Sequence, residues 1–214
     1  MSQPLRLGIA QMDATVGDLD GNAAAILQTA RQMQAKGGQL LITPELAICG
    51  YPPEDWLLRP AFVRACAGAV HALASQIPHD AAILLGAPWL LEGRLYNAAL
   101  LLTRGQVKVA ALKMCLPNTG VFDEHRLFQP GLPQPPVDAG GFRLGVLICE
   151  DLWSPPASAA LAMQGAQVLV ALNASPYEMD KPRRRLEQAA ARVRETGLPL
   201  LYVNLCGGQD EIVY

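Results

Sequence analysis

The chain has 214 residues, of which 51% are hydrophobic and 17% are charged, and its formal net charge is −2. This length and apolar content suit one well-buried domain, and the lack of a basic excess argues against a nucleic-acid partner. No apolar stretch reaches the roughly 18 residues that a membrane span needs, and the N-terminal sequence has no signal-peptide pattern, so we expect no membrane association.

Strand-like and helix-like segments alternate along the chain. Hydrophobic periodicity predicts strands over 5–12, 39–43, 81–89, 96–103, 107–114, 143–149, 167–174 and 200–206. It predicts helices over 21–36, 60–77, 156–165 and 181–196, and a long irregular stretch over 115–141. A glycine turn leads into a last strand, 211–214, whose partner strand we expect to lie outside this sequence. Hairpins and helical crossovers together predict one α/β domain with mixed sheets.

The cysteines are widely scattered and form no CxxC pair. There are five of them, at Cys49, Cys66, Cys115, Cys149 and Cys206. An odd number at such spacings predicts neither a disulfide framework nor a metal site, and we therefore expect a reducing, cytoplasmic environment.

The segment GVLICEDLW, residues 145–153, raises the main functional question. On the pattern alone Cys149 is either a buried structural residue or a nucleophile, and the pattern favours the structural interpretation because free cysteine is among the most buried residue types. The adjacent Glu150 and Asp151 would disfavour a thiolate. A nucleophile at this position therefore needs a base and a cation from elsewhere in the chain.

Two charged residues follow apolar strands, where α/β folds build their sites. Glu45 follows LLITP and could take a thiol proton as a general base. Lys113 follows VKVAAL and could lower the pKa of a thiol or stabilise an oxyanion. The alternatives are an acid in a solvated loop for Glu45 and a charge at a strand end that reaches solvent for Lys113.

Five segments together resemble the nitrilase, or carbon–nitrogen hydrolase, superfamily. They are PELAICGYPPED (44–55), KMCLPNTGVFDEHRLFQPG (113–131), GVLICEDLW (145–153), NASPY (173–177) and YVNLCGGQDEIVY (202–214). Within it they are similar to the glutaminase domains of the glutamine-dependent NAD synthetases, over essentially the whole chain. The resemblance implies a four-layer α-β-β-α sandwich with mixed sheets. It also implies that residues 1–214 are one glutaminase domain, truncated at its C-terminus.

The resemblance assigns roles to particular residues. It implies that Glu45, Lys113 and Cys149 are catalytic and that Glu124 supports the lysine. It implies substrate contacts at Tyr51, Phe122, Trp153, Ser175 and Lys181. The aromatic residues could equally serve core packing, and Lys181 could belong to a solvated helix face over 181–185. Thr119 stands where many relatives carry tyrosine, and the pair at 150–151 is then structural, hydrogen-bonded to backbone at the turn.

The implied function is the hydrolysis of glutamine, which supplies ammonia for the ATP-dependent amidation of deamido-NAD to NAD. The resemblance implies no cofactor or metal in this domain, ATP and Mg²⁺ in a C-terminal synthetase domain of the same polypeptide, and a homo-oligomer. No phosphate-binding loop of the SGGxDS kind occurs in the sequence. Two alternatives stay open: a stand-alone amidase that acts on another small amide, and a catalytically idle module that serves assembly.

Overall fold

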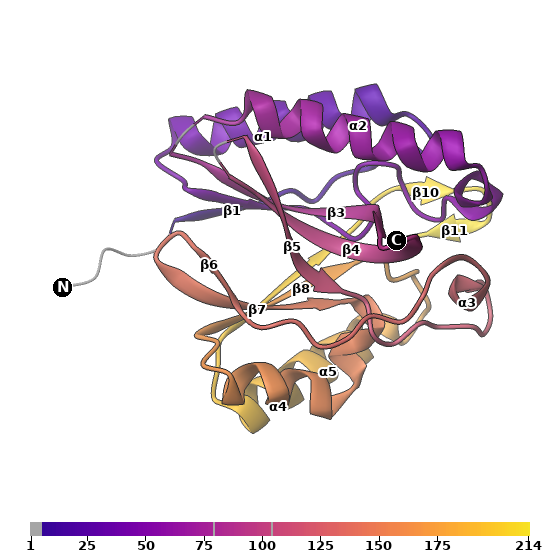
Figure 1. Ribbon diagram of the computed structural model, residues 1–214. Coiled ribbons are helices and arrows are strands. Elements are labelled where there is room, and N and C mark those ends of the chain that lie inside the picture. Colours follow the sequence, from indigo (N-terminus) through magenta and orange to yellow (C-terminus); the bar gives the residue numbers. More distant parts are fainter. Residues whose placement is uncertain (1–5, 79, 104) are drawn as a thin grey trace.

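The computed structural model describes residues 6–78, 80–103 and 105–214. Two β-sheets lie face to face, and helices cover the outer face of each (Figure 1). This arrangement confirms the predicted four-layer α-β-β-α sandwich, and the sheets are mixed as expected.

The first sheet has the strand order β1-β2-β3-β4-β5. Its strands are β1 (Leu7–Ile9), β2 (Leu40–Ile42), β3 (Ala82–Leu91), β4 (Arg94–Thr103) and β5 (Gln106–Leu112). The first three pair in parallel, and β3, β4 and β5 form two antiparallel hairpins. Helices α1 (Leu19–Ala35) and α2 (Pro60–Gln76) cover its outer face (Figure 1).

The second sheet has the order β6-β7-β8-β9. Its strands are β6 (Val137–Ala139), β7 (Phe142–Ile148), β8 (Val168–Asn173) and β9 (Leu200–Asn204). β6 is antiparallel to β7, and β7, β8 and β9 are parallel. Helices α4 (Pro155–Met163) and α5 (Lys181–Thr196) cover this sheet (Figure 1).

An apolar layer fills the space between the sheets. Ile42 and Leu84 of the first sheet and Val146, Ile148 and Leu172 of the second belong to one buried cluster. Strands buried on both faces read as continuous apolar runs, which is why β2, β7 and β8 were recognisable in the sequence. The ends of these strands are consequently held at fixed positions by packing on both sides.

Short elements depart from the sequence predictions. The stretch 115–141 contains the helix α3 (Glu124–Leu127) as well as β6, and helical turns η1 (Glu54–Leu58) and η2 (Cys149–Trp153) were not foreseen. The expectation that the last strand lacks its partner is wrong, since β11 (Ile212–Val213) pairs antiparallel with β10 (Gly208–Gln209). The turn between them uses a left-handed backbone at Asp210, which brings two residues predicted as turn into a ladder.

Candidate active site

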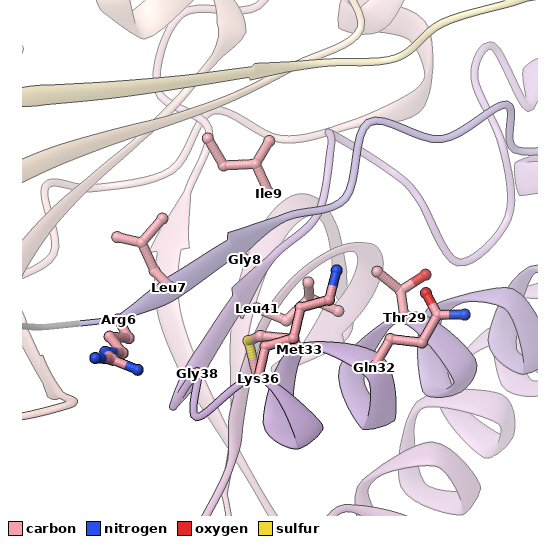
Figure 2. Close-up of a pocket in the computed structure, with 10 residues that line it drawn as sticks. All are labelled: Arg6, Leu7, Gly8, Ile9, Thr29, Gln32, Met33, Lys36, Gly38 and Leu41. Atoms are coloured by element: carbon pink, nitrogen blue, oxygen red, sulfur yellow. The ribbon is translucent and has the colours of Figure 1, made fainter.

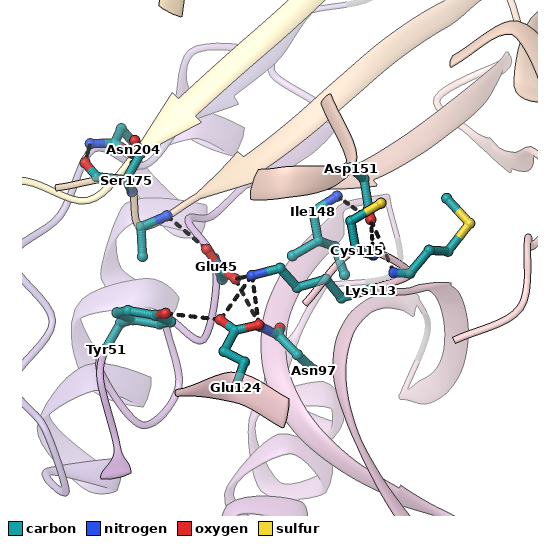
Figure 3. A network of polar contacts seen from close by, with 12 residues as sticks. Glu45, Tyr51, Asn97, Lys113, Cys115, Glu124, Ile148, Asp151, Ser175 and Asn204 are labelled. Atoms are coloured by element: carbon teal, nitrogen blue, oxygen red, sulfur yellow. Dashed lines mark hydrogen bonds and ion pairs between the residues drawn. The ribbon is translucent and has the colours of Figure 1, made fainter. Parts of the chain in front are cut away.

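The charged residues predicted from the sequence meet at one place between the sheets (Figure 3). Glu45 lies just beyond β2, Lys113 directly follows β5, and Glu124 is the first residue of α3. All three are buried, with exposed fractions of 1%, 1% and 3%. Cys149, 4% exposed, directly follows β7 and begins η2.

Lys113 bridges two carboxylates. Its Nζ donates to Glu45 Oε1 at 2.7 Å and to Glu124 Oε1 at 2.8 Å. Tyr51 Oη donates to the same oxygen of Glu124 at 2.8 Å. Burial would lower the pKa of Lys113, but the two carboxylates outweigh burial and raise that pKa above its ordinary value. The ammonium is therefore charged throughout the neutral range.

Glu45 is held by three donors from three different elements (Figure 3). Besides Lys113, Asn97 Nδ2 donates to Oε1 at 2.8 Å, and the backbone N–H of Ala174 donates to Oε2 at 2.9 Å. The segment that carries Glu45 lies directly on Gly86 of β3. A Cβ at Gly86 would lie 2.3 Å from the carbonyl oxygen of Pro44, so no other residue fits there without displacing the segment.

Burial and the neighbouring charges shift the pKa values of Glu124 and Cys149. Burial raises the pKa of Glu124 to about 7, against the charge of Lys113 and with a further contribution from Glu45. Burial and the charge of Glu45 raise the pKa of the Cys149 thiol, and Lys113 and the N–H of Ala174 oppose this shift. The unliganded site consequently holds Cys149 as a neutral thiol at neutral pH.

Cys149 adopts a left-handed backbone conformation, with φ +47°. In a residue other than glycine this conformation costs about 1–2 kcal/mol and is concentrated at functional sites. Leu46, next to Glu45, has the same kind of backbone, with φ +49°. Both residues that the sequence proposes for proton transfer are thus placed by sharp, strained turns at strand ends.

Asp151 acts on backbone groups, as the sequence suggested for the pair 150–151. Its Oδ1 accepts from the N–H groups of Met114 at 3.0 Å and Cys115 at 2.8 Å, and its Oδ2 accepts from Ile148 N at 3.1 Å. Among the carboxylates, Glu45 and Glu124 contribute most to raising the pKa of the Cys149 thiol. Asp151 instead ties the chain after Lys113 to the chain before Cys149.

A cavity of about 760 Å³ lies beside this cluster. Phe122, Trp153 and Lys181 line it, as does Thr119. Its wall also includes Glu150, which follows Cys149 in the chain. Phe122 and Glu150 of this wall are two residues and one residue away in the chain from Glu124 and Cys149, and the charged residues themselves are not among the residues of the wall.

The remaining predicted residues, Tyr51 and Ser175, are both buried. Tyr51 is buried in the core, where its ring lies 6.4 Å from that of Phe122 in an edge-on arrangement. Ser175 is also buried, and its Oγ accepts from Arg185 Nε at 3.2 Å. Neither is among the residues of the cavity wall.

The basic segment 181–185 is not simply a solvated helix face. Lys181 pairs with Glu178 at 3.0 Å and has a side chain only 14% exposed. The guanidinium of Arg184 lies over the ring of Trp153, 5.5 Å from its centroid. Arg185 Nη2 donates to the carbonyl oxygens of Ser175 and Pro176, the latter at 2.7 Å. Lys181 and Arg185 are partly buried where they meet acceptors, whereas Arg184 is exposed and lies over the aromatic ring.

The sequence analysis did not identify the residues that hydrogen-bond to the predicted site residues. Asn97 contacts Glu45, and Asn204 brackets Ser175 by accepting from its N–H at 2.9 Å and donating to its carbonyl at 3.1 Å. Asn97 interrupts an apolar strand, YNAALLL, which is a visible but weak signal. Arg185 is hidden in a run of three arginines, where no pattern distinguishes it from its neighbours.

A second hollow lies away from the predicted residues. A hollow of about 570 Å³ lies between β1 and α1, and none of the predicted residues lines it (Figure 2). Among residues 6–78, 80–103 and 105–214, no group of three or more His, Cys, Asp or Glu side chains is arranged to hold a metal ion. None of the described helices is both long and apolar enough to cross a membrane.

The fold and the cluster at its strand ends define the class of protein. The profile of the family described as "Carbon-nitrogen hydrolase" matches residues 6–214, and the chain therefore belongs to this enzyme family. Among curated proteins, it is 42% identical to the glutamine-dependent NAD(+) synthetase of Rhodobacter capsulatus, over 100% of this chain and 39% of that protein. It is 36% identical to the enzyme of the same name from Thermotoga maritima, over 98% of this chain and 37% of that protein. The chain thus spans about two fifths of the length of these relatives.

Solved structures give the same result. The glutamine-dependent NAD⁺ synthetase of Acinetobacter baumannii, determined in complex with ADP, superposes with a TM-score of 0.89 at 35% identity. The match covers 97% of this chain and 39% of that one. An amidase of the nitrilase superfamily from Nesterenkonia sp. superposes with a TM-score of 0.82 at 28% identity, covering 98% of this chain and 79% of the amidase.

Proposed function

We propose that this chain hydrolyses the side-chain amide of glutamine through Cys149, Glu45 and Lys113. The observation that carries the proposal is the buried Glu45–Lys113–Glu124 cluster, which is bonded to Ala174 at the end of β8, next to the end of β7 where Cys149 stands. It supplies a nucleophile, a base and a cation from separate strand ends within one water-poor site. A structure of the Nesterenkonia amidase has acrylamide added to its active-site cysteine, which supports a cysteine nucleophile in this fold.

The first half-reaction forms a thioester. Glu45 takes the proton of the Cys149 thiol as the sulfur attacks the amide carbon, so an S–H bond breaks while S–C and O–H bonds form. The negative charge then passes to the former carbonyl oxygen. Glu45 returns its proton to the amide nitrogen, the C–N bond breaks, and ammonia leaves a γ-glutamyl thioester on Cys149.

The second half-reaction releases glutamate. Water attacks the thioester carbon while Glu45 accepts one of its protons, and the C–S bond then breaks. The thiolate regains the proton from Glu45, so the enzyme returns to its starting state. Because burial and Glu45 raise the pKa of the free thiol, the transfer to Glu45 occurs with attack on bound substrate and not beforehand.

Lys113 pairs with both carboxylates of the cluster and supplies its positive charge. An ammonium has three N–H donors, and Glu45 and Glu124 each engage Nζ within 2.8 Å. The positive charge of Lys113 stabilises the oxyanion as it develops. Glu124, itself bonded by Tyr51, fixes the direction in which the ammonium points.

The cavity wall would select the substrate. Phe122 and Trp153 would pack on the aliphatic part of glutamine, and Lys181 would pair with its α-carboxylate. Ser175 would contribute at the amino-acid end, from its position beside the wall. A site built to pair charged α-groups rejects analogues that lack them, because its own polar groups are then left unpaired. Glutamine should therefore be preferred over simple aliphatic amides.

We also propose that the ammonia serves the ATP-dependent amidation of deamido-NAD. The support is that each synthetase relative is more than twice as long as the matched segment. ATP and Mg²⁺ would bind in a further synthetase domain of the same polypeptide, and a homo-oligomer is the expected assembly. Given glutamine, ATP, Mg²⁺ and deamido-NAD, this chain alone should release glutamate and ammonia, and formation of NAD would contradict the proposal.

The decisive test is the variant Cys149→Ala, assayed for glutamate release from glutamine. We expect a loss of about 10³-fold or more, as for other nucleophiles. Cys206→Ala is the matched control and should keep the parent rate, because Cys206 lies outside the cluster and the cavity wall. Mass spectrometry of the quenched parent should detect a γ-glutamyl adduct on Cys149. If the Cys149→Ala enzyme keeps more than about a tenth of the parent rate, Cys149 is not the nucleophile.

A stand-alone amidase with another substrate is the second candidate. It is favoured by the structural likeness to the Nesterenkonia amidase, which superposes with a TM-score of 0.82 at 28% identity. A panel of glutamine, asparagine, acetamide and propionamide separates the two functions. Higher kcat/KM for an aliphatic amide than for glutamine would favour the amidase.

A further inference from the structure

Asn97 is a buried polar residue within an apolar strand. It lies in β4, has an exposed fraction of 0%, and is followed by Ala98, Ala99 and Leu100. A buried amide is costly unless it is hydrogen-bonded. Its Nδ2 donates to Glu45 Oε1 at 2.8 Å, and its backbone carbonyl accepts from the N–H of Lys113 at 2.9 Å. One residue thus contacts both the carboxylate and the chain that carries the ammonium.

Charge fixes the orientation of this amide. If the amide group were reversed, its oxygen would face the Glu45 carboxylate, and two acceptors would oppose each other. Among the described residues, Asn97 Oδ1 has no hydrogen-bond partner. The bond to Glu45 is therefore the side-chain contact that orients Asn97, and in return it restrains rotation of the carboxylate.

The two oxygens of Glu45 are not equivalent. Oε1 accepts from both Lys113 and Asn97, which occupies its two lone-pair positions. Oε2 accepts from the N–H of Ala174 alone among the described residues. Ala174 directly follows β8 and Cys149 directly follows β7, and these two strands are neighbours in the second sheet, with Ile148 opposite Leu172. Oε2 is consequently the oxygen on the side of the nucleophile, and it has an open acceptor position.

We propose that Asn97 is a positioning residue that holds Glu45 in one orientation, in which Oε2 takes and returns the protons of the reaction. The inference rests on the proposed role of Glu45 as the base. In each half-reaction the proton leaves sulfur or water, forms the Oε2–H bond, and then passes to the departing nitrogen or sulfur. Without Asn97 the carboxylate loses a donor on Oε1 and turns more freely, so Oε2 faces Cys149 less often.

The test compares two buried asparagines. Asn97→Leu removes the donor at similar size, and Asn97→Asp keeps the shape but cannot donate when ionised. The matched control is Asn22→Leu. Asn22 is also buried and donates to the carbonyls of Thr15 and Ile48, but it contacts none of Glu45, Lys113, Glu124 or Cys149. Steady-state kinetics with glutamine and thermal midpoints are measured for all three, together with Glu45→Gln.

The expected result separates kcat from KM. Both Asn97 variants should lower kcat by about 10–100-fold, as loss of an outer hydrogen-bond partner does in other sites, and should leave KM within about twofold. The amide of Asn97 donates to Glu45, so its loss should act on the base and not on the binding of substrate. Asn22→Leu should lower the thermal midpoint but keep kcat near that of the parent. A merely structural role for Asn97 would give the pattern of Asn22.

Two outcomes would overturn the inference while leaving the proposed function intact. One is an Asn97→Leu enzyme with kcat within about threefold of the parent while Glu45→Gln is inactive. The other is a change confined to KM. If Asn97→Leu does not fold, Asn97→Asp is judged by the same limits. Activity retained by Glu45→Gln would refute the proposed function itself.

Discussion

The charged cluster and the cavity wall beside it are built in opposite ways. Glu45, Lys113 and Glu124 are almost completely buried, and each is bonded to a group from another element. The wall is formed largely by irregular segments and one helix, and some of its side chains are well exposed, such as Val121 at 46% and Tyr177 at 57%. In the proposed enzyme, the chemistry is therefore placed by the rigid sheets, and recognition is left to segments that can change without disturbing it.

The largest effect should come from changing the cluster. Lys113→Ala removes the cation between two buried carboxylates and should lower kcat/KM by at least about 10²–10³-fold. With Lys113 absent, the carboxylates of Glu45 and Glu124 act on the thiol unopposed, so the pKa of Cys149 should rise further. Alkylation of Cys149 by iodoacetamide, followed against pH, should move to higher pH in the variant. An unchanged pH profile would contradict the electrostatic role of Lys113.

An intermediate effect should come from the support of the wall. Arg185 bonds the carbonyls of Ser175 and Pro176 and the hydroxyl of Ser175, so Arg185→Ala should raise KM for glutamine by about tenfold with a smaller change in kcat. Arg183→Ala on the same helix is the control, because Arg183 is 70% exposed and pairs only with Glu187 among the described residues. Equal KM values for the two variants would show that Arg185 does not hold the substrate site.

The smallest effect should come from Asp151, which links two strand ends without contacting the cluster. Both oxygens of Asp151 accept hydrogen bonds from backbone N–H groups, and an asparagine has only one oxygen that can accept. Asp151→Asn should therefore cost about 1–3 kcal/mol of stability. Burial raises the pKa of Asp151 to about 6, so its carboxyl favours the folded state at acidic pH, and this contribution is lost as the pH rises from about 4 to 6.

Unfolding of parent and Asp151→Asn at several pH values tests this prediction. The parent should lose stability from this carboxyl between about pH 4 and 6, and the variant should lack that component. Equal stability at all pH values would show that the three backbone bonds to Asp151 contribute little. A loss of kcat without a loss of stability would instead place Asp151 in the chemistry.

Periodicity predicted the strands, and the resemblance to the carbon–nitrogen hydrolases supplied the four layers and the roles of the charged residues. Apolar runs long enough to read as strands end at or just before Glu45, Lys113 and Cys149, so the position of each polar residue was visible. The elements α3 and β6 are too short to show a period, and they were not foreseen. Asn97 and Arg185 could not be assigned, because their roles depend on groups 52 and 10 residues away in the chain. Local pattern shows which residues stand at strand ends, but not which side chains they meet.

The N–H of Ala174 has a consequence for how mutational data on this protein are interpreted. It is a main-chain group that donates to Glu45 Oε2, yet it belongs to a residue whose side chain is a single methyl group. Systematic replacement of side chains leaves this donor untouched, and position 174 would score as unimportant or as a simple packing site. Proline is the one standard residue that deletes the group, and it also fixes the backbone angle. Chemical synthesis with an ester in place of this peptide bond would remove the donor alone.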